Sequence, residues 1–170
     1  RGTIISDGDK PLYLFGCINE IGAVQKADNV SGLLGESTLK SYIQQLLPKL
    51  PNGFLLRIGL DDFKKINEKL GTDYGDSVLK RTADDISSCI LPGQKIYRVQ
   101  SDEFIVLDFA GGTKSIAIDL YKRIRSFISK FVADNHYEAV FTISAGLLTS
   151  ENIIQHTYSD IMKYSDFSLN

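Results

Sequence analysis

The stretch YRVQSDEFIVL, residues 97–107, carries the most information about the fold of this chain. Aromatic and β-branched residues dominate both of its ends, which is typical of strands. Four polar residues lie between the ends, from Gln100 to Glu103, and two of them are adjacent carboxylates. The stretch therefore predicts two antiparallel strands joined by a tight acidic turn.

The segments around this hairpin alternate between helical and extended patterns. Residues 54–60 are nearly continuously apolar, which favours a central strand covered on both faces. Apolar residues at helical spacing predict the helices. We expect, in chain order, a helix over 36–50, the strand over 54–60, a helix ending at 70, a break over 71–75, a helix ending at 92–93, the hairpin, a helix over 116–131, a strand over 139–148 and a helix from 158. This order predicts an α/β (α+β) fold, a central mixed sheet flanked by helices.

Residues 1–27 form a separate unit in this interpretation. The turn sequence DGDKP, at 7–11, lies between a β-branched run at 3–5 and an apolar run at 12–21. This pattern predicts an N-terminal β-hairpin, followed by a polar connector. The second unit is expected to cover residues 28–170.

Composition narrows the classes of function. The chain has 170 residues, of which 43% are hydrophobic, and a net charge of −2. This charge offers no basic surface for nucleic acid or an anionic membrane, and no apolar run approaches the ~20 residues of a membrane span. Cys17 and Cys89 stand alone in apolar surroundings, which predicts buried, reduced thiols. We therefore expect a cytoplasmic segment without nucleic-acid or membrane contact, although the parent protein could be membrane-attached.

Five segments, in order, resemble motifs of the GGDEF (diguanylate cyclase) family. The family implies a ferredoxin-like palm related to nucleotidyl cyclases, and the match spans residues 28–170, truncated within the last helix. Residues 7–21 resemble the last two strands of a PAS sensor domain; the alternative is an ordinary terminal hairpin. The GGDEF segments are DNVSGLL at 28–34, IGLDDFKKIN at 58–67, Gly71 with Gly75-Asp76, TISAG at 142–146 and SDFSL at 165–169.

The resemblance implies a metal site that this chain alters. Active members join two GTP molecules into cyclic di-GMP, with Mg²⁺ bound by carboxylates from the first strand and the hairpin turn. Gly59 stands where the family has a metal-binding Asp, and it offers no oxygen ligand. Asp61 could replace that carboxylate, but the alternative is a helix N-cap or turn residue.

The hairpin turn departs from the family in the same direction. Gln100 and Ser101 replace two glycines, which allow positive φ and close approach of a ligand. We expect the hairpin to form and the catalytic site to be lost. Asp102 and Glu103 match a metal ligand and a catalytic carboxylate; opposite Gly59, the alternative is that they are solvated turn acids.

Other family positions retain groups suited to a nucleotide. Asn67 and Asp76 match the guanine-recognising pair; the alternative is that Asn67 caps its helix and Asp76 starts the next. The backbone N–H groups of Asp62 and Phe63 could cradle phosphate at a helix start, and Lys64 could screen it. Mg²⁺ is the cofactor expected if nucleotide binds.

The inhibitory site of the family is expected to be absent. Residues 91–94 read LPGQ where the family has R-x-x-D. Without that Arg there is no planar fork to grip the phosphates of the product.

These observations predict a degenerate, catalytically inactive GGDEF domain. It would act as a regulatory, GTP-sensing or dimerisation module in a cyclic di-GMP signalling protein. Its expected partners are GTP, a second copy of the chain, a neighbouring PAS sensor domain and an EAL-type output domain. Two alternatives remain: a weakly active diguanylate cyclase that uses Asp61, Asp102 and Glu103, and a protein-interaction scaffold that binds no nucleotide.

Overall fold

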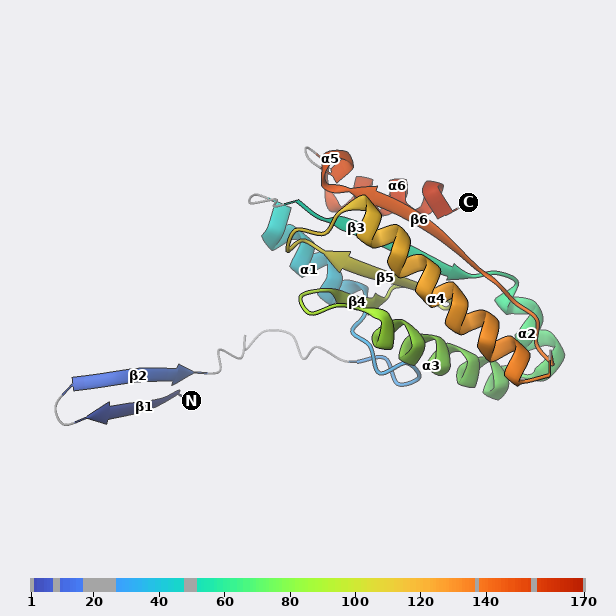
Figure 1. The fold of residues 1–170 in the computed structure, drawn as a ribbon, viewed down its shortest axis with the longest axis horizontal. Helices are drawn as coiled ribbons and strands as arrows, with labels where there is room; N and C mark the ends of the chain where they lie inside the picture. Colours follow the sequence, from blue (N-terminus) through green and yellow to red (C-terminus); the bar gives the residue numbers. More distant parts are fainter. Residues whose placement is uncertain are drawn as a thin grey trace.

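Figure 1 shows the computed structural model of the chain. The structure describes residues 2–7, 10–16, 27–47, 52–136, 138–153 and 156–169, the first two ranges as backbone only. Strands β1 (Gly2–Asp7) and β2 (Lys10–Gly16) pair antiparallel, which confirms the expected N-terminal hairpin. Cys17 and the expected connector to residue 26 lie outside the described residues.

A four-stranded sheet forms the centre of the fold over residues 36–169. Its strands are β3 (Phe54–Leu60), β4 (Lys95–Arg98), β5 (Glu103–Asp108) and β6 (Ile143–Thr149), in the order β4-β5-β3-β6. All three strand pairs are antiparallel. The mixed pairing that we expected is therefore limited to one isolated parallel bridge, between Leu34 and Tyr97. The order and the intervening helices are those of the ferredoxin-like fold.

Helices cover both faces of this sheet (Figure 1). Side chains of a strand alternate between faces, so Phe54, Leu56 and Ile58 pack in one core and Leu55 in the other. The first core includes residues of α2 (Phe63–Leu70), α3 (Thr72–Cys89) and α4 (Lys114–Asp134); the second includes residues of α1 (Glu36–Leu46), α5 (Ser150–Ile153) and α6 (Tyr158–Leu169).

Several predicted boundaries were wrong. Helix α1 ends at Leu46 rather than at 50, and α3 ends at Cys89 rather than at 92–93. The break expected over 71–75 is confined to Gly71, whose φ of 89° permits the sharp change of direction between α2 and α3. The strand expected over 139–148 begins only at Ile143. Its partner β3 ends at the pair Leu60–Ile143, so residues 139–142 have no strand beside them.

Apart from these boundaries, the predicted helices are confirmed. The predicted burial of Cys89 is confirmed as well. Cys89 is buried and makes no disulfide among the described residues, and burial raises the pKa of its thiol. In the described part of the chain, no helix combines the length and the apolar character needed to cross a membrane.

Candidate functional site

The signature turn forms without glycine. Among the described residues other than glycine, only Asp62 and His136 have positive φ, so Gln100 and Ser101 adopt ordinary backbone conformations. The Val99 N–H donates to the Glu103 carbonyl at 3.0 Å, which closes the turn. The prediction that the hairpin survives the loss of its glycines is confirmed.

Asp28, from the opening motif, is connected to this turn through Arg98. Its carboxylate accepts hydrogen bonds from the Ser31 N–H and hydroxyl at 2.7 Å and from the Arg98 guanidinium at 2.6 Å. Arg98 also donates to the Ser101 carbonyl. Burial raises the pKa of Asp28, but the hydrogen bonds from Ser31 and Arg98 outweigh it, so the pKa lies below its usual value. The ionised Asp28 carboxylate therefore has a structural role: its hydrogen bonds with Ser31 and Arg98 stabilise the hairpin.

Replacing Asp28 by Ala should lower the free energy of unfolding by about 2 kcal/mol at pH 7, because several hydrogen bonds to a charged acceptor are lost. A depressed folded-state pKa stabilises the fold above the unfolded pKa of about 3.9, and this contribution disappears as the pH falls through the folded value. Urea denaturation at pH 7 and pH 3 measures both effects. The gap between wild type and Asp28→Ala should shrink at pH 3; an equal gap at both pH values would contradict this role.

Glu103 is bound by an arginine that lies inside the apolar strand β3. Arg57 is only 2% exposed, and its Nε and Nη2 donate to Glu103 Oε2 at 2.9 and 2.5 Å. The Glu103 side chain is itself only 15% exposed. The interpretation of Glu103 as a solvated turn acid was therefore wrong. Sequence reasoning missed Arg57, although a lone charge in an apolar run signals that a buried partner must exist.

The same guanidinium also binds helix α6. Its Nη1 donates to the Met162 carbonyl at 3.1 Å and to Ser165 Oγ at 3.2 Å, and Nη2 lies 3.4 Å from Asp166 Oδ1. Arg57 thus joins the signature hairpin, the central strand and α6 in one polar cluster.

Gly59 lies beside this cluster and is covered by α6. It pairs with Glu103 on one side of β3 and with Ser144 on the other. A Cβ placed on Gly59 would lie 3.2 Å from Leu169 Cδ2. The space into which an Asp at this position would project is therefore taken by the end of the Leu169 side chain.

The remaining acidic residues have other partners. Asp61 accepts hydrogen bonds from Thr142 Oγ1 at 2.5 Å and from Ser144 Oγ at 2.7 Å, so it ties the end of β3 to β6. It is a turn residue, as one alternative held, but the N-cap position belongs to Asp62, which makes no capping hydrogen bond. Asp102 accepts from its neighbour Ser101 Oγ at 2.7 Å.

These residues do not fit a Mg²⁺ site. Mg²⁺ requires near-octahedral oxygen ligands, yet position 59 has no side chain, Glu103 is bound by Arg57 and Asp61 by two hydroxyls. Within the described ranges, no group of three His, Cys, Asp or Glu side chains is arranged to hold a metal ion. Asp102 alone remains of the ligand set that the resemblance implies.

The proposed guanine pair comes together where α2 meets α3. The Asn67 side chain packs on Gly75, where an added Cβ would lie 1.8 Å from Asn67 Oδ1. Gly75 directly precedes Asp76, which is exposed as the fifth residue of α3 rather than its first. Asn67 Oδ1 is buried and has no hydrogen-bond partner among the described residues. Asn67 lies inside α2, three residues before its last residue Leu70, so it does not occupy the helix-end position that the alternative gave it.

The start of α2 is open to solvent except for Phe63. Asp62 has a left-handed backbone with φ of 60° and pairs with Lys65 at 2.7 Å. Phe63 is buried in the core, and Lys64 is 89% exposed, 3.6 Å from Glu68. The charges of Asp62 and Lys64 are therefore each paired with a residue of α2, and no contact among the described residues assigns these three positions a ligand.

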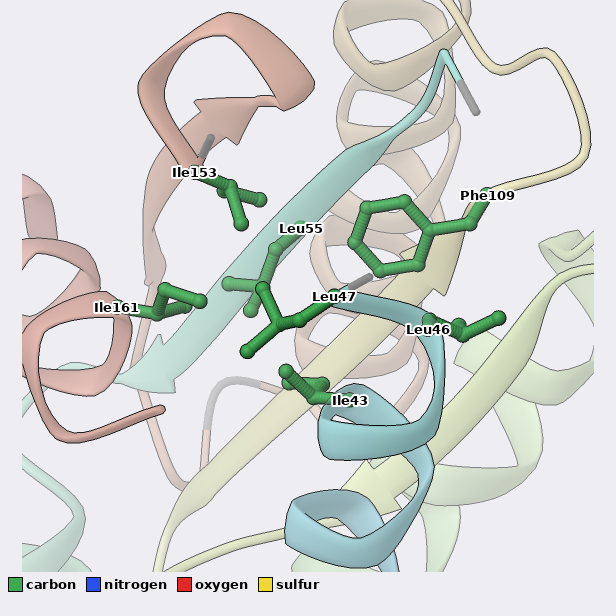
Figure 2. A pocket seen from close by; sticks show the side chains of 7 residues that line it. All are labelled: Ile43, Leu46, Leu47, Leu55, Phe109, Ile153 and Ile161. Atoms are coloured by element: carbon green, nitrogen blue, oxygen red, sulfur yellow. The ribbon is translucent and has the colours of Figure 1, made fainter. Parts of the chain in front are cut away.

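Two further features do not form a nucleotide site. At the position of the family's inhibitory motif, the Gln94 side chain closes its own turn, accepting from the Leu91 N–H at 2.8 Å and donating to Asp108 at 3.0 Å. Figure 2 shows a pocket between α1, β3 and α6, where nothing polar could bind phosphate or a base. All of its lining residues are apolar: Ile43, Leu46, Leu47, Leu55, Phe109, Ile153 and Ile161.

Comparison with known proteins agrees with this geometry at the level of the family. The family model "Diguanylate cyclase, GGDEF domain" matches residues 25–170. The probable diguanylate cyclase DgcT of Escherichia coli is 30% identical over 145 residues, which cover 83% of this chain and 30% of DgcT. The diguanylate cyclase DgcS of Shewanella oneidensis is 36% identical over 70 residues, 41% of this chain and 24% of DgcS. The chain thus spans less than a third of the length of either relative.

Solved structures share the fold. The diguanylate cyclase SiaD from Pseudomonas aeruginosa, solved with its activator SiaC, superposes with a TM-score of 0.74 at 24% identity, over 84% of this chain and 56% of SiaD. An S helix-GGDEF-EAL structure of LapD from Vibrio cholerae, bound to c-di-GMP, gives a TM-score of 0.70 at 18% identity, over 85% of this chain and 33% of LapD. With the family match over residues 25–170, the chain belongs to the GGDEF family and is a homologue of the diguanylate cyclases of cyclic di-GMP signalling.

Proposed function

We propose that this chain is a catalytically degenerate GGDEF domain, acting as a regulatory, GTP-sensing or dimerisation module in a cyclic di-GMP signalling protein. The observation that carries the proposal is the pairing of Glu103 with the buried Arg57 beside Gly59. Phosphoryl transfer relies on metal ions to neutralise developing charge. A carboxylate already bound by a guanidinium, next to a position without a ligand, is poorly suited to that task.

The region around Asn67 and Asp76, where α2 meets α3, supports the proposal that the domain still binds a nucleotide. Buried polar atoms nearly always have a hydrogen-bond partner, and Asn67 Oδ1 has none among the described residues. The exposed Asp76 carboxylate could accept hydrogen bonds from the ring N–H and amino groups of guanine, and the Asn67 amide could donate to guanine's acceptor atoms. GTP is therefore the ligand that we propose for this corner, in preference to a scaffold that binds no nucleotide.

Calorimetric titration tests the proposal. GTP should bind, ATP should not, EDTA should change the affinity little, and no cyclic di-GMP should form at high protein concentration. Asn67→Ala and Asp76→Ala should each weaken GTP binding by about fivefold, since one hydrogen bond contributes about 1 kcal/mol. Asp73→Ala is the matched control, because it removes an exposed carboxylate from the first turn of the same helix.

Other outcomes would favour the alternatives. Formation of cyclic di-GMP would support the weakly active cyclase that uses Asp61, Asp102 and Glu103, and would contradict the proposal. Absence of GTP binding to a folded protein would support the pure interaction scaffold. Equal weakening by Asp73→Ala would show that net charge, rather than the guanine pair, governs binding.

The domain context is also a proposal. We divide the chain into residues 1–27, the possible end of a PAS sensor domain, and residues 28–170, the GGDEF-like domain. An EAL-type output neighbour is supported by the S helix-GGDEF-EAL architecture of LapD. Pairing with a second copy of the chain is the further partner that we propose.

A further inference from the structure

A positive charge sits inside the central strand of this domain. Every residue of β3 is buried, and Arg57 is 2% exposed. A buried charge is tolerated when it is paired and hydrogen-bonded. Arg57 meets both conditions through Glu103, Ser165 and the Met162 carbonyl. Strand β3 therefore carries a buried cation that its hydrogen bonds hold in one position.

This cation lies at the place where a metal would be expected to balance carboxylates. Residues 57 and 59 are two apart on β3, so they face the same side of the sheet. Gly59 pairs directly with Glu103, the carboxylate that Arg57 binds at 2.9 Å through Nε. Leu169 covers Gly59, with its Cδ2 3.2 Å from the position of an added Cβ. The face thus holds one hairpin carboxylate, one guanidinium that also lies 3.4 Å from Asp166 Oδ1, and an apolar cover.

We propose that Arg57 is the built-in counter-ion of Glu103, and that it makes the signature hairpin independent of divalent cations. The guanidinium is covalently attached to β3, whereas a bound metal would dissociate on dilution. Its Nη1 contacts to α6 also fix the helix that brings Leu169 over Gly59. This inference extends the proposed loss of turnover, but it concerns stability and metal binding and holds with or without nucleotide.

Thermal unfolding with added MgCl2 or MnCl2, at constant ionic strength, tests the proposal on the unmodified chain. The melting temperature of the wild type should change by less than about 1 °C, because a ligand stabilises only a fold that binds it. A saturable rise in the wild type would overturn the proposal. GTP is absent from this experiment, so its outcome is separable from that of the nucleotide titration.

A designed variant makes the converse test. Arg57→Leu combined with Gly59→Asp removes the cation and places two carboxylates opposite each other, at 59 and 103, which repel when unbalanced. This variant should gain metal-dependent stability, roughly 5–10 °C at 100 times the dissociation constant. The matched control, Arg57→Leu with Gly59→Ala, has the same Cβ without the carboxylate and should gain nothing.

The single variant Gly59→Asp separates the two contributions. With Arg57 still in place, we expect a weaker metal response than that of the double variant, since the guanidinium still binds the Glu103 carboxylate. If Gly59→Asp alone responds as strongly as the double variant, Arg57 does not govern metal binding and the proposal fails. If the double variant is unfolded without metal, metal should refold it, because metal binding and folding are coupled; failure to refold counts against the proposal.

Discussion

Replacement of Arg57 by Ala should lower the free energy of unfolding by about 3–5 kcal/mol, the usual cost of breaking a buried ion pair by removing one partner. The substitution leaves the Glu103 carboxylate, only 15% exposed, without its guanidinium. It also leaves Ser165 Oγ and the Met162 carbonyl without the Nη1 donor. Equilibrium denaturation in urea measures the loss, with circular dichroism to verify that the variant is folded in water.

Two companion variants separate charge from packing. Arg57→Met combined with Glu103→Leu removes both charges and retains volume, and replacing a buried pair in this way is often neutral or stabilising. The double variant should therefore be more stable than Arg57→Ala. Arg57→Lys keeps the charge but loses the planar fork, so its stability should lie between wild type and Arg57→Ala. A loss below about 1 kcal/mol for Arg57→Ala would place the pair among ordinary surface salt bridges and contradict its buried role.

Local sequence patterns predicted most of the secondary structure. The apolar run at 54–60, the hairpin around 100–103 and the final helix from 158 appear in the structure as expected. Each depends on residues close together in the chain, where periodicity and turn residues are informative. The start of β6 was misplaced because it depends on where β3 ends, a property of another segment.

The polar contacts of the site could not be predicted from local patterns. Arg57 and Glu103 are 46 residues apart, and Arg57 and Met162 are 105 apart. No residue close to Arg57 in the sequence indicates these partners. The apolar run around Arg57 predicted a core strand without polar contacts. The same holds for Asp61, whose hydroxyl partners Thr142 and Ser144 are contributed by the far end of the chain. The resemblance to the family identified which positions belong to the site. Only the structure showed the hydrogen bonds and ion pairs that these residues make.

Gly146 determines how closely α6 approaches this cluster. It pairs with Arg57 across the β3–β6 ladder. A Cβ on Gly146 would lie 2.7 Å from the Ser165 carbonyl oxygen and 2.9 Å from the Leu169 backbone nitrogen. These are backbone atoms of α6, so no side-chain rotation relieves the overlap. The absence of a side chain at 146 is what allows Ser165 to reach Arg57 and Leu169 to cover Gly59.

Gly146→Ala should therefore destabilise the domain by about 3 kcal/mol, the upper part of the range for overpacking, although Ala for Gly within a strand is otherwise favourable. Gly59→Ala is the matched control, because its Cβ would meet only the flexible end of Leu169, at 3.2 Å; it should cost less than about 1 kcal/mol. Urea denaturation compares the free energy of unfolding of the two variants. Hydrogen exchange of the α6 amides shows whether the helix has moved away from the sheet. Unchanged stability of Gly146→Ala would mean that α6 can shift without cost, and the contacts of Arg57 to Ser165 and Met162 could then not be what fixes the helix.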